Sequence, residues 1–340
     1  MRFYQVEPTL ENYWRGVILF GRNAATYKFA LAQALYDIQQ QKPGSDLILL
    51  ADLAQPFSQH LCRHLQQAPK QGTAGRSRFL DACQQFNRGE IGQDRLTELT
   101  VRLGFANVLD AFHIVNRAEI ATRFFVDERK SHGAIRLTEN FYQLGERPQY
   151  HSLALETEAR WRLVEQAWAQ GISRQLIGME YDEQTRMLFS LLNARRVNIT
   201  SCRDALNGYQ KGRCFYCDTP VSLRSGDQNL ADVDHVIPWA IRDKVPNIDG
   251  VWNLVLACRD CNRGREGKFA LAPPQWAMER LRQRNDYIID SHLPLHETLS
   301  RQTGATASAR LHFLQRAWNT AIETLIHIWQ QPAPRGEERL

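Results

Sequence analysis

The spacing of apolar residues along the chain predicts mostly helical structure. From Glu156, residues Trp161, Val164 and Trp168 recur three or four positions apart, as on one face of an amphipathic helix. The same test predicts a helix over residues 182–195. A longer stripe near the C-terminus consists of Leu311, Leu314, Trp318, Ile322, Leu325 and Trp329. Such stripes are typical of helices that pack against other elements.

Shorter segments show the pattern of strands. Residues 133–138 form one of them. Residues 232–239 alternate polar and apolar positions into Pro238, as a strand does before a turn, and residues 253–257 can supply the return strand. Residues 258–265 can then open a helix. The sequence therefore predicts a β-hairpin followed by a helix, within an α+β fold that is mostly helical.

Pro148 and its polar neighbours indicate a domain boundary. We expect an N-terminal α+β domain of unknown role over residues 1–147 and a helical connector over residues 148–200. A small domain follows over residues 201–272, and then C-terminal helices over residues 273–331. Residues 332–340 contain two prolines and a glycine and are expected to be a disordered tail.

Composition and charge exclude only a few classes of protein. The excess of 42 basic over 37 acidic residues gives a net charge of +5, which permits a nucleic-acid partner without arguing for one. No run approaches the roughly 18 apolar residues that span a bilayer, and the N-terminus lacks the apolar stretch of a secretory signal. We therefore expect a cytoplasmic protein without a membrane partner. Its seven cysteines should then be metal ligands or buried apolar residues rather than disulfides.

Four of the cysteines form two matching pairs, Cys214-Phe-Tyr-Cys217 and Cys258-Arg-Asp-Cys261. Each Cys-x-x-Cys turn brings two thiolates to one ion, and two such turns complete the tetrahedral shell of a structural zinc site. The alternatives are two coincidental pairs or a thioredoxin-like redox pair, which would leave the other pair unexplained. The remaining cysteines, Cys62, Cys83 and Cys202, stand alone in helical surroundings and are expected to pack as apolar residues.

The segment between the cysteine pairs carries residues suited to phosphodiester hydrolysis. This reaction needs a base to activate water and a cation to neutralise the charge that develops on the phosphate. His235 can be the base, because histidine titrates near neutral pH. Asp234 supplies a hard oxygen ligand for Mg²⁺ or a similar ion, with Asp232 as an alternative on the same face of the strand. Asn262 offers a carbonyl oxygen on the same side, and the amide of Asn253 can hold the loop that bears His235.

The pattern Cys-x-x-Cys, Asp-His-x-x-Pro, Asn-Leu-x-x-x-Cys-x-x-Cys-Asn closely resembles the HNH endonucleases, in the branch that carries a four-cysteine zinc site. The ββα-metal motif of that family cleaves DNA. The resemblance implies that residues 201–272 are an HNH nuclease domain with His235 as general base. It further implies Asp234 and Asn262 as ligands of a catalytic Mg²⁺ or Mn²⁺ ion, and Asn253 as the orienting residue.

The chain departs from the family pattern in two ways. The third of the residues after which the family is named is often His. Here it is Asn262, a variant common in the cysteine-bearing branch. The family also tends to place a lysine three residues later, where this chain has Arg265. The basic role would then pass to Arg263, Arg265 or Lys268 as phosphate contacts, the alternative being a solvated helix end.

Residues 12–23 and 26–28 resemble a segment of longer bacterial HNH proteins, several of which belong to anti-phage defence systems. This resemblance implies a defence role, with protein partners in such a system.

Three functions are compatible with these residues. The leading hypothesis is an endonuclease that hydrolyses DNA. A non-catalytic zinc-dependent module that binds nucleic acid, and a nuclease that cleaves RNA, are the alternatives. The presence of Asp234, His235 and Asn262 together favours the enzyme over the binding module.

Overall fold

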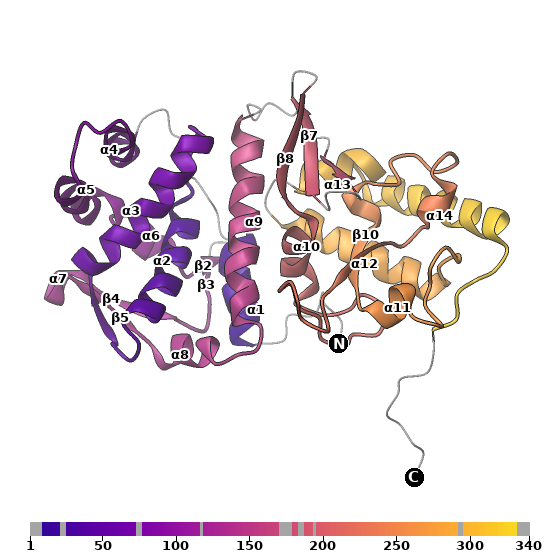
Figure 1. The fold of residues 1–340 in the computed structure, drawn as a ribbon, viewed down its shortest axis with the longest axis horizontal. Coiled ribbons are helices and arrows are strands. Elements are labelled where there is room, and N and C mark those ends of the chain that lie inside the picture. The colour runs from indigo at the N-terminus through magenta and orange to yellow at the C-terminus, as the bar shows by residue number, and fades with distance from the viewer. Residues whose placement is uncertain are drawn as a thin grey trace, which may run out of the picture. The chain divides into compact units, whose positions relative to one another are not determined.

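The computed structural model describes residues 9–20, 25–72, 77–115, 118–169, 179–182, 187–192, 195–291 and 295–331. The chain divides into two compact units: residues 7–173, here the N-terminal unit, and residues 174–340 with residues 1–6, here the C-terminal unit. The fold is α+β and mostly helical, as the sequence predicts (Figure 1). Within the described ranges, no helix combines the length and the apolar character needed to cross a membrane.

The N-terminal unit combines helices with small antiparallel sheets of strand order β1-β5-β4 and β2-β3. The strand predicted over residues 133–138 is confirmed as β5, which lies between β1 and β4. The elements are α1 (Leu10–Phe20), α2 (Tyr27–Gln41), β1 (Leu47–Leu49), α3 (Leu50–Gln67), α4 (Arg78–Asn87), α5 (Gln93–Leu99), a π-helical turn (Thr100–Gly104), α6 (Val108–Ala111), β2 (Ile114–Val115), β3 (Ala118–Glu119), β4 (Phe125–Glu128), α7 (Arg129–His132), β5 (Ala134–Leu137), α8 (Glu139–Gly145) and α9 (Tyr150–Ala169).

Aromatic side chains form much of the core of this unit. Trp14 on α1 meets Phe124 edge to face, with ring centroids 4.9 Å apart. Phe57 on α3 stacks on Phe79 of α4, with centroids 5.7 Å apart and planes within 3°. Because aromatic residues bury large apolar areas, these contacts hold their helices on a common core.

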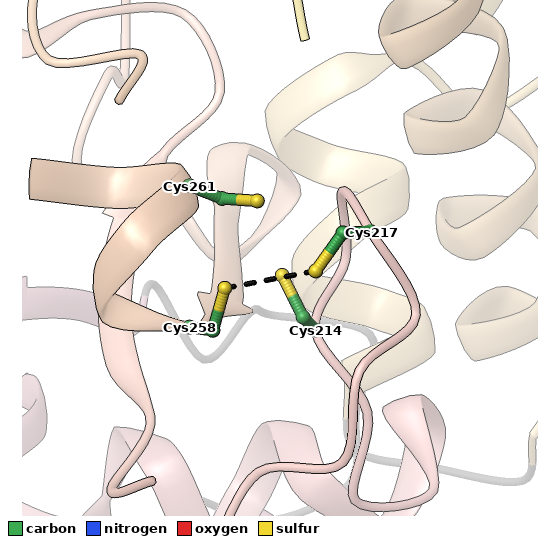
Figure 2. A group of neighbouring side chains, drawn as sticks. All are labelled: Cys214, Cys217, Cys258 and Cys261. Carbon is green, nitrogen blue, oxygen red and sulfur yellow. Dashed lines mark hydrogen bonds between the residues drawn. The ribbon is translucent and has the colours of Figure 1, made fainter. Parts of the chain in front are cut away.

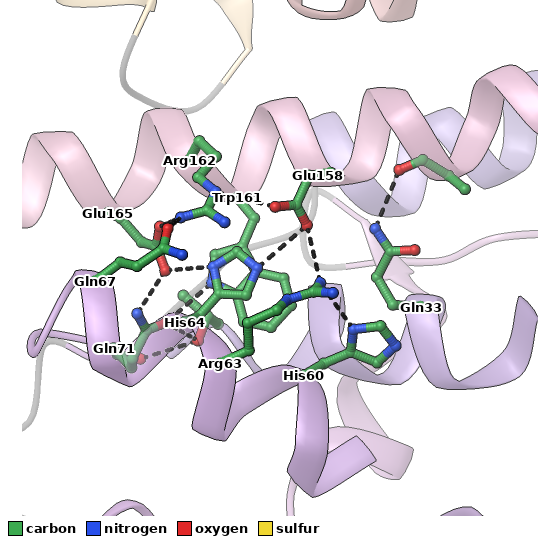
Figure 3. A network of polar contacts seen from close by, with 12 residues as sticks. Gln33, His60, Arg63, His64, Gln67, Gln71, Glu158, Trp161, Arg162 and Glu165 are labelled. Carbon is green, nitrogen blue, oxygen red and sulfur yellow. Dashed lines mark hydrogen bonds and ion pairs between the residues drawn. The ribbon is translucent and has the colours of Figure 1, made fainter. Parts of the chain in front are cut away.

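A buried polar network joins α3 to α9 (Figure 3). The ring of His64 stacks on that of Trp161 with centroids 3.6 Å apart, and His64 Nδ1 lies 2.6 Å from Glu165 Oε1. Gln71 donates a hydrogen bond to the same Glu165 oxygen at 2.6 Å. Since buried polar groups need hydrogen-bond partners, these contacts favour one register between the two helices.

Helix α9 is therefore part of the N-terminal unit, which continues to residue 173. The sequence pattern instead suggested a boundary at Pro148 and a connector over residues 148–200. The helix begins at Tyr150, earlier than Glu156, and Glu156 forms a buried ion pair with Arg15 of α1 at 2.7 Å. Arg15 also donates to Gln149 at 2.9 Å. Because a buried charge is costly without its partner, these contacts oppose separation of α9 from α1.

The C-terminal unit contains the elements β6 (Met179–Asp182), β7 (Met187–Leu192), β8 (Arg195–Ser201), α10 (Cys202–Gln210), β9 (Asp232–His235), the 3₁₀ turns Trp239–Ile241 and Val251–Asn253, β10 (Leu254–Ala257), α11 (Arg259–Arg263), α12 (Gln275–Asp290), α13 (Leu295–Thr303) and α14 (Ala307–Leu325). The helix predicted over residues 182–195 is wrong. That stretch contains β7, which pairs antiparallel with β6 and with β8 in a three-stranded sheet.

The predicted β-hairpin and its following helix are confirmed. Strand β9 pairs antiparallel with β10, with His235 opposite Leu254 and Asp234 opposite Val255, and α11 follows. Gln210 on α10 supports the other edge of β10. Its side chain donates to the carbonyl of Leu256 at 2.9 Å and accepts the N–H of Leu256 at 2.7 Å. A side chain thus occupies the place that the next strand would have in a larger sheet.

Beyond α14 the chain returns to the segment that follows α11. Ala272 and Ile328 form a parallel bridge, and the N–H of Trp329 donates to the carbonyl of Ala272 at 2.9 Å. Trp329 is buried, its indole Nε1 donates to the carbonyl of Glu266 at 2.8 Å, and its ring centroid lies 5.1 Å from that of Tyr216. The tail predicted over residues 332–340 lies outside the described residues.

Candidate metal centre and active site

Four cysteine side chains converge beside the hairpin (Figure 2). Their Sγ atoms all lie within 4.8 Å of one another, and Cys217 Sγ is 3.6 Å from Cys258 Sγ. Cys214 and Cys217 come from the loop after α10, Cys258 caps the N-terminus of α11, and Cys261 lies on that helix. In a tetrahedral zinc centre with bonds of about 2.3 Å, neighbouring sulfur atoms are about 3.8 Å apart. The cluster therefore fits four thiolate ligands around one zinc ion.

The thiols of the cluster strongly influence one another. Hydrogen bonding with Cys214 lowers the pKa of Cys217. Hydrogen bonding with Cys214 is also the main reason that the pKa of Cys258 falls to about 7. Hydrogen bonding with the neighbouring thiols raises the pKa of Cys214 and of Cys261. Metal binding requires thiolates, so a bound cation would have to displace the protons that the last two retain. Outside the cluster, Cys62, Cys83 and Cys202 are buried, in agreement with their expected packing role.

Asp234 lies on β9 next to the first cysteine turn and is 7% exposed. The hydroxyl of Tyr216 donates to Asp234 Oδ2 at 2.5 Å, and Lys268 Nζ lies 3.3 Å from the same oxygen. Among the described residues, no hydrogen bond reaches Asp234 Oδ1. Two donors thus hold one carboxylate oxygen and leave the other as a hard ligand atom for a divalent cation.

Lys268 fits neither of its expected roles, a phosphate contact or a solvated residue at a helix end. Its side chain is 0% exposed, and Nζ donates to the carbonyls of His235 at 2.9 Å and Phe269 at 3.2 Å. The ammonium group is therefore enclosed, since these carbonyls and Asp234 surround it. Lys268 orients Asp234 in this structure and does not reach solvent.

Asn262 and Asp232 meet where α11 crosses β9. The amide nitrogen of Asn262 donates to Asp232 Oδ2 at 3.3 Å. Arg263 donates to both oxygens of Asp232, at 2.9 and 3.1 Å. The side-chain carbonyl oxygen of Asn262 accepts no hydrogen bond within the described part of the chain. Asp232 therefore holds α11 against the hairpin, whereas Asn262 retains an open oxygen.

His235 ends β9, and its side chain is 10% exposed. Its Nε2 lies 2.9 Å from Asp249 Oδ1, which comes from the loop between β9 and β10. A hydrogen bond from Nε2 to a carboxylate fixes the imidazole orientation and selects the tautomer in which Nδ1 can accept a proton. The carboxylate also stabilises the positive charge that the ring would then carry.

Asn253 is fully buried and holds the loop after His235. Its side-chain oxygen accepts the N–H of Ile237 at 2.8 Å, and its amide nitrogen donates to the carbonyls of Ile237 at 2.8 Å and Ile248 at 3.0 Å. Each amide atom thus has a backbone partner, so Asn253 is placed to position the loop rather than to bind an ion.

A family model matches the part of the chain that contains these residues. The model of the HNH endonuclease family matches residues 214–268, from the first cysteine of the cluster to the buried lysine. The chain carries an HNH endonuclease domain. The HNH domain lies wholly in the C-terminal unit, and its matched stretch contains all four cysteines. No curated protein and no solved structure matches the chain.

Two side chains that contact Asp234 and His235 were not predicted from the sequence. Tyr216 stands between two cysteines, where a Cys-x-x-Cys turn imposes no residue type. Asp249 is an acidic residue in the loop that joins two predicted strands. A search for carboxylates close in sequence to the histidine would have found Asp249. No comparable signal marks Tyr216.

Proposed function

We propose that the HNH domain is the active centre of a metal-dependent endonuclease that hydrolyses phosphodiester bonds in DNA. The observation that carries the proposal is the orientation of Asp234. Tyr216 and Lys268 hold one of its oxygens and leave the other open, one residue before His235. A buried carboxylate with an open oxygen, one residue before a histidine in the chain, supplies the two groups that metal-assisted hydrolysis needs.

His235 is the general base in this proposal. Its Nδ1 takes a proton from the water that attacks phosphorus, while Asp249 steadies the imidazolium through Nε2. The bond between phosphorus and the 3′ oxygen breaks as the new bond to the water oxygen forms. The products are a 5′-phosphate and, once the leaving oxygen has gained a proton, a 3′-hydroxyl.

Asp234 and Asn262 would hold the catalytic ion through their open oxygen atoms, which suit Mg²⁺ or Mn²⁺. Such an ion, when bound, neutralises the charge that develops on the phosphate and the leaving oxygen. The cysteine cluster would hold a separate zinc ion with a structural role, because four thiolates leave no position for water. Arg263 and Arg265 are exposed and can contact phosphates beside the site.

The test is cleavage of plasmid, linear duplex DNA, single-stranded DNA and RNA by the full chain, with and without Mg²⁺ or Mn²⁺. General bases typically contribute about 10²–10⁴-fold to a rate, so His235→Ala should lose at least that much turnover while it still binds nucleic acid. Cleavage by His235→Ala at the wild-type rate would refute the assignment. Binding without cleavage by the wild type would identify a binding module, and cleavage of RNA alone would change the substrate.

A further inference from the structure

A groove of about 580 Å³ is lined by both chain neighbours of Lys268, Gly267 and Phe269. It is lined in part by Arg265, Gly267, Phe269, Leu271, Ile328 and Trp329. Residues 265–271 belong to the segment after α11, and residues 328–329 belong to the segment that returns after α14. The groove is thus formed in part by the loop whose Lys268 contacts Asp234.

Phe269 is presented to solvent in this groove with 55% of its surface exposed. Its φ of 43° lies in the left-handed region, which is costly for a bulky residue that is not glycine. Hydrogen bonds hold the backbone there. The N–H of Phe269 donates to the carbonyl of Asn262 at 3.0 Å, and its carbonyl accepts Lys268 Nζ at 3.2 Å. The loop that orders the two ion-site residues therefore also fixes an aromatic ring outside the protein core, and such local strain is often kept where it serves a function.

The segment that returns after α14 contributes Trp329 and Ile328 to the groove. Trp329 is 2% exposed, and hydrogen bonds from its indole and its backbone N–H fix it to Glu266 and Ala272. Ile328 next to it is 44% exposed. Ile328 thus offers apolar surface next to a residue that hydrogen bonds hold in place.

A guanidinium group without a partner among the described residues lies at the same groove. Arg265 lines it, is exposed, and has no hydrogen bond or ion pair within the described residues. Arg263, on the preceding turn, is paired with Asp232 at 2.9 Å, and the acidic Glu266 also lines the groove, so Arg265 is the cation that the groove offers. An aromatic ring together with a free guanidinium group is a combination by which proteins bind single-stranded nucleic acid, with a base on the ring and a phosphate on the cation.

We propose that this groove binds an unpaired nucleobase of the substrate strand, stacked on Phe269, next to the phosphate at the ion site. The proposal rests on the proposed nuclease function and adds a substrate class to it. In a duplex, neighbouring base pairs cover the faces of each base, so an open face is offered by a single strand or by a locally unpaired base. The enzyme would therefore prefer single-stranded or opened DNA to intact duplex.

The test measures binding rather than cleavage. Full-length protein with His235→Ala is titrated, without added divalent ion, into a fluorescent single strand that contains 2-aminopurine and into the matching duplex. Stacking on an aromatic residue typically contributes about 5- to 150-fold to affinity. Phe269→Ala should weaken single-strand binding by at least about fivefold, should abolish the quenching of 2-aminopurine, and should leave duplex binding within about twofold.

Two variants serve as controls. Phe269→Trp should retain single-strand affinity and quenching, because it keeps a ring. Leu311→Ala removes an apolar residue of similar exposure, 50%, on α14 outside this groove, and should change neither measurement. Melting temperature checks that each variant is folded.

The proposal is overturned if Phe269→Ala binds the single strand as its parent does, or if duplex and single strand lose affinity equally. The second outcome would indicate a wedge into duplex DNA or a general packing defect. Failure of the nuclease function itself is distinguishable, because that would appear as cleavage by His235→Ala or as no cleavage by the wild type, whatever the binding results.

Discussion

Removal of the hydroxyl of Tyr216 would test how the HNH domain orients its carboxylate. Tyr216 is 2% exposed and donates to Asp234 Oδ2 at 2.5 Å. Burial, with the nearby charge of Asp234, raises the pKa of Tyr216 well above its usual value, so the phenol keeps the proton that it donates. The variant Tyr216→Phe retains the ring and its packing against Trp276 and Trp329. Only the hydrogen bond is lost.

The magnitude follows from the charge of the acceptor. A hydrogen bond to a charged group contributes about 1.5–3 kcal/mol to stability. In a unit of this size, each kcal/mol shifts the melting temperature by about 2–4 °C, so the C-terminal unit should melt about 3–12 °C lower. Loss of a group that orients a metal ligand typically costs about 10- to 100-fold in metal affinity or activity. We therefore expect cleavage to need a correspondingly higher Mg²⁺ concentration, with partial recovery at saturation.

The assay combines calorimetric melting with cleavage rates across a Mg²⁺ titration. Tyr209→Phe is the matched control. Tyr209 is 1% exposed in the same unit, and its hydroxyl pairs with the neutral hydroxyl of Ser291 at 3.0 Å. This control should lose about 1 kcal/mol and leave the Mg²⁺ dependence unchanged. Wild-type stability and Mg²⁺ dependence in Tyr216→Phe would refute the reasoning.

Four further results are expected. Elemental analysis should give about one zinc per chain, and Cys258→Ser should lower zinc content and solubility; zinc-free active protein would contradict the zinc site. Brief EDTA treatment should abolish cleavage without removing zinc, and Mg²⁺ should restore it, whereas cleavage that persists in EDTA would count against an exchangeable ion. Asp249→Ala should lower kcat by about 10- to 100-fold with little change in KM, and Asp249→Asn should recover part of the loss. If both variants changed KM by the same factor and left kcat unchanged, Asp249 would not position His235. Burial lowers the pKa of His113 to about 3 from 6.5. As the pH falls, the unfolded N-terminal unit therefore binds a proton at His113 at a higher pH than the folded unit does. The stability of that unit should therefore be intact above about pH 6.5 and fall by about 1.4 kcal/mol per pH unit below it. If the melting temperature of His113→Gln fell as steeply with decreasing pH as that of the wild type, His113 would not be the cause.

The chemical core of the HNH domain was predictable because its signals are local in sequence. Two residues separate the cysteines of each pair, and the hairpin strands follow from alternation within a few positions. The stretch containing Met187–Leu192 is different. It is a short apolar run rich in leucine, which has a high helix propensity, and such a run fits either a helix or a strand. Pairing with β6 and β8 decides in favour of the strand.

The orientation of the site depends on contacts that no spacing encodes. Lys268 had the pattern of a basic residue at a helix end, yet the turn after α11 directs it inward to Asp234. Its burial follows from where the loop after α11 closes over the hairpin. For the same reason, Asp249 and Tyr216 became visible as orienting residues only in three dimensions. A sequence pattern shows which groups are present, and the fold shows which oxygen of Asp234 is already taken.

The return of the chain after α14 bears on how such a domain could be inherited or grafted. Inside the matched stretch, Tyr216 packs against Trp276 and Trp329, and Trp252 packs against Phe313. All three covering rings lie downstream of residue 268. Recombination that moved residues 214–268 alone into another protein would leave buried aromatic faces open to water. The transferable cassette is therefore larger than the family motif and has to include the downstream helices together with the segment that ends in Trp329.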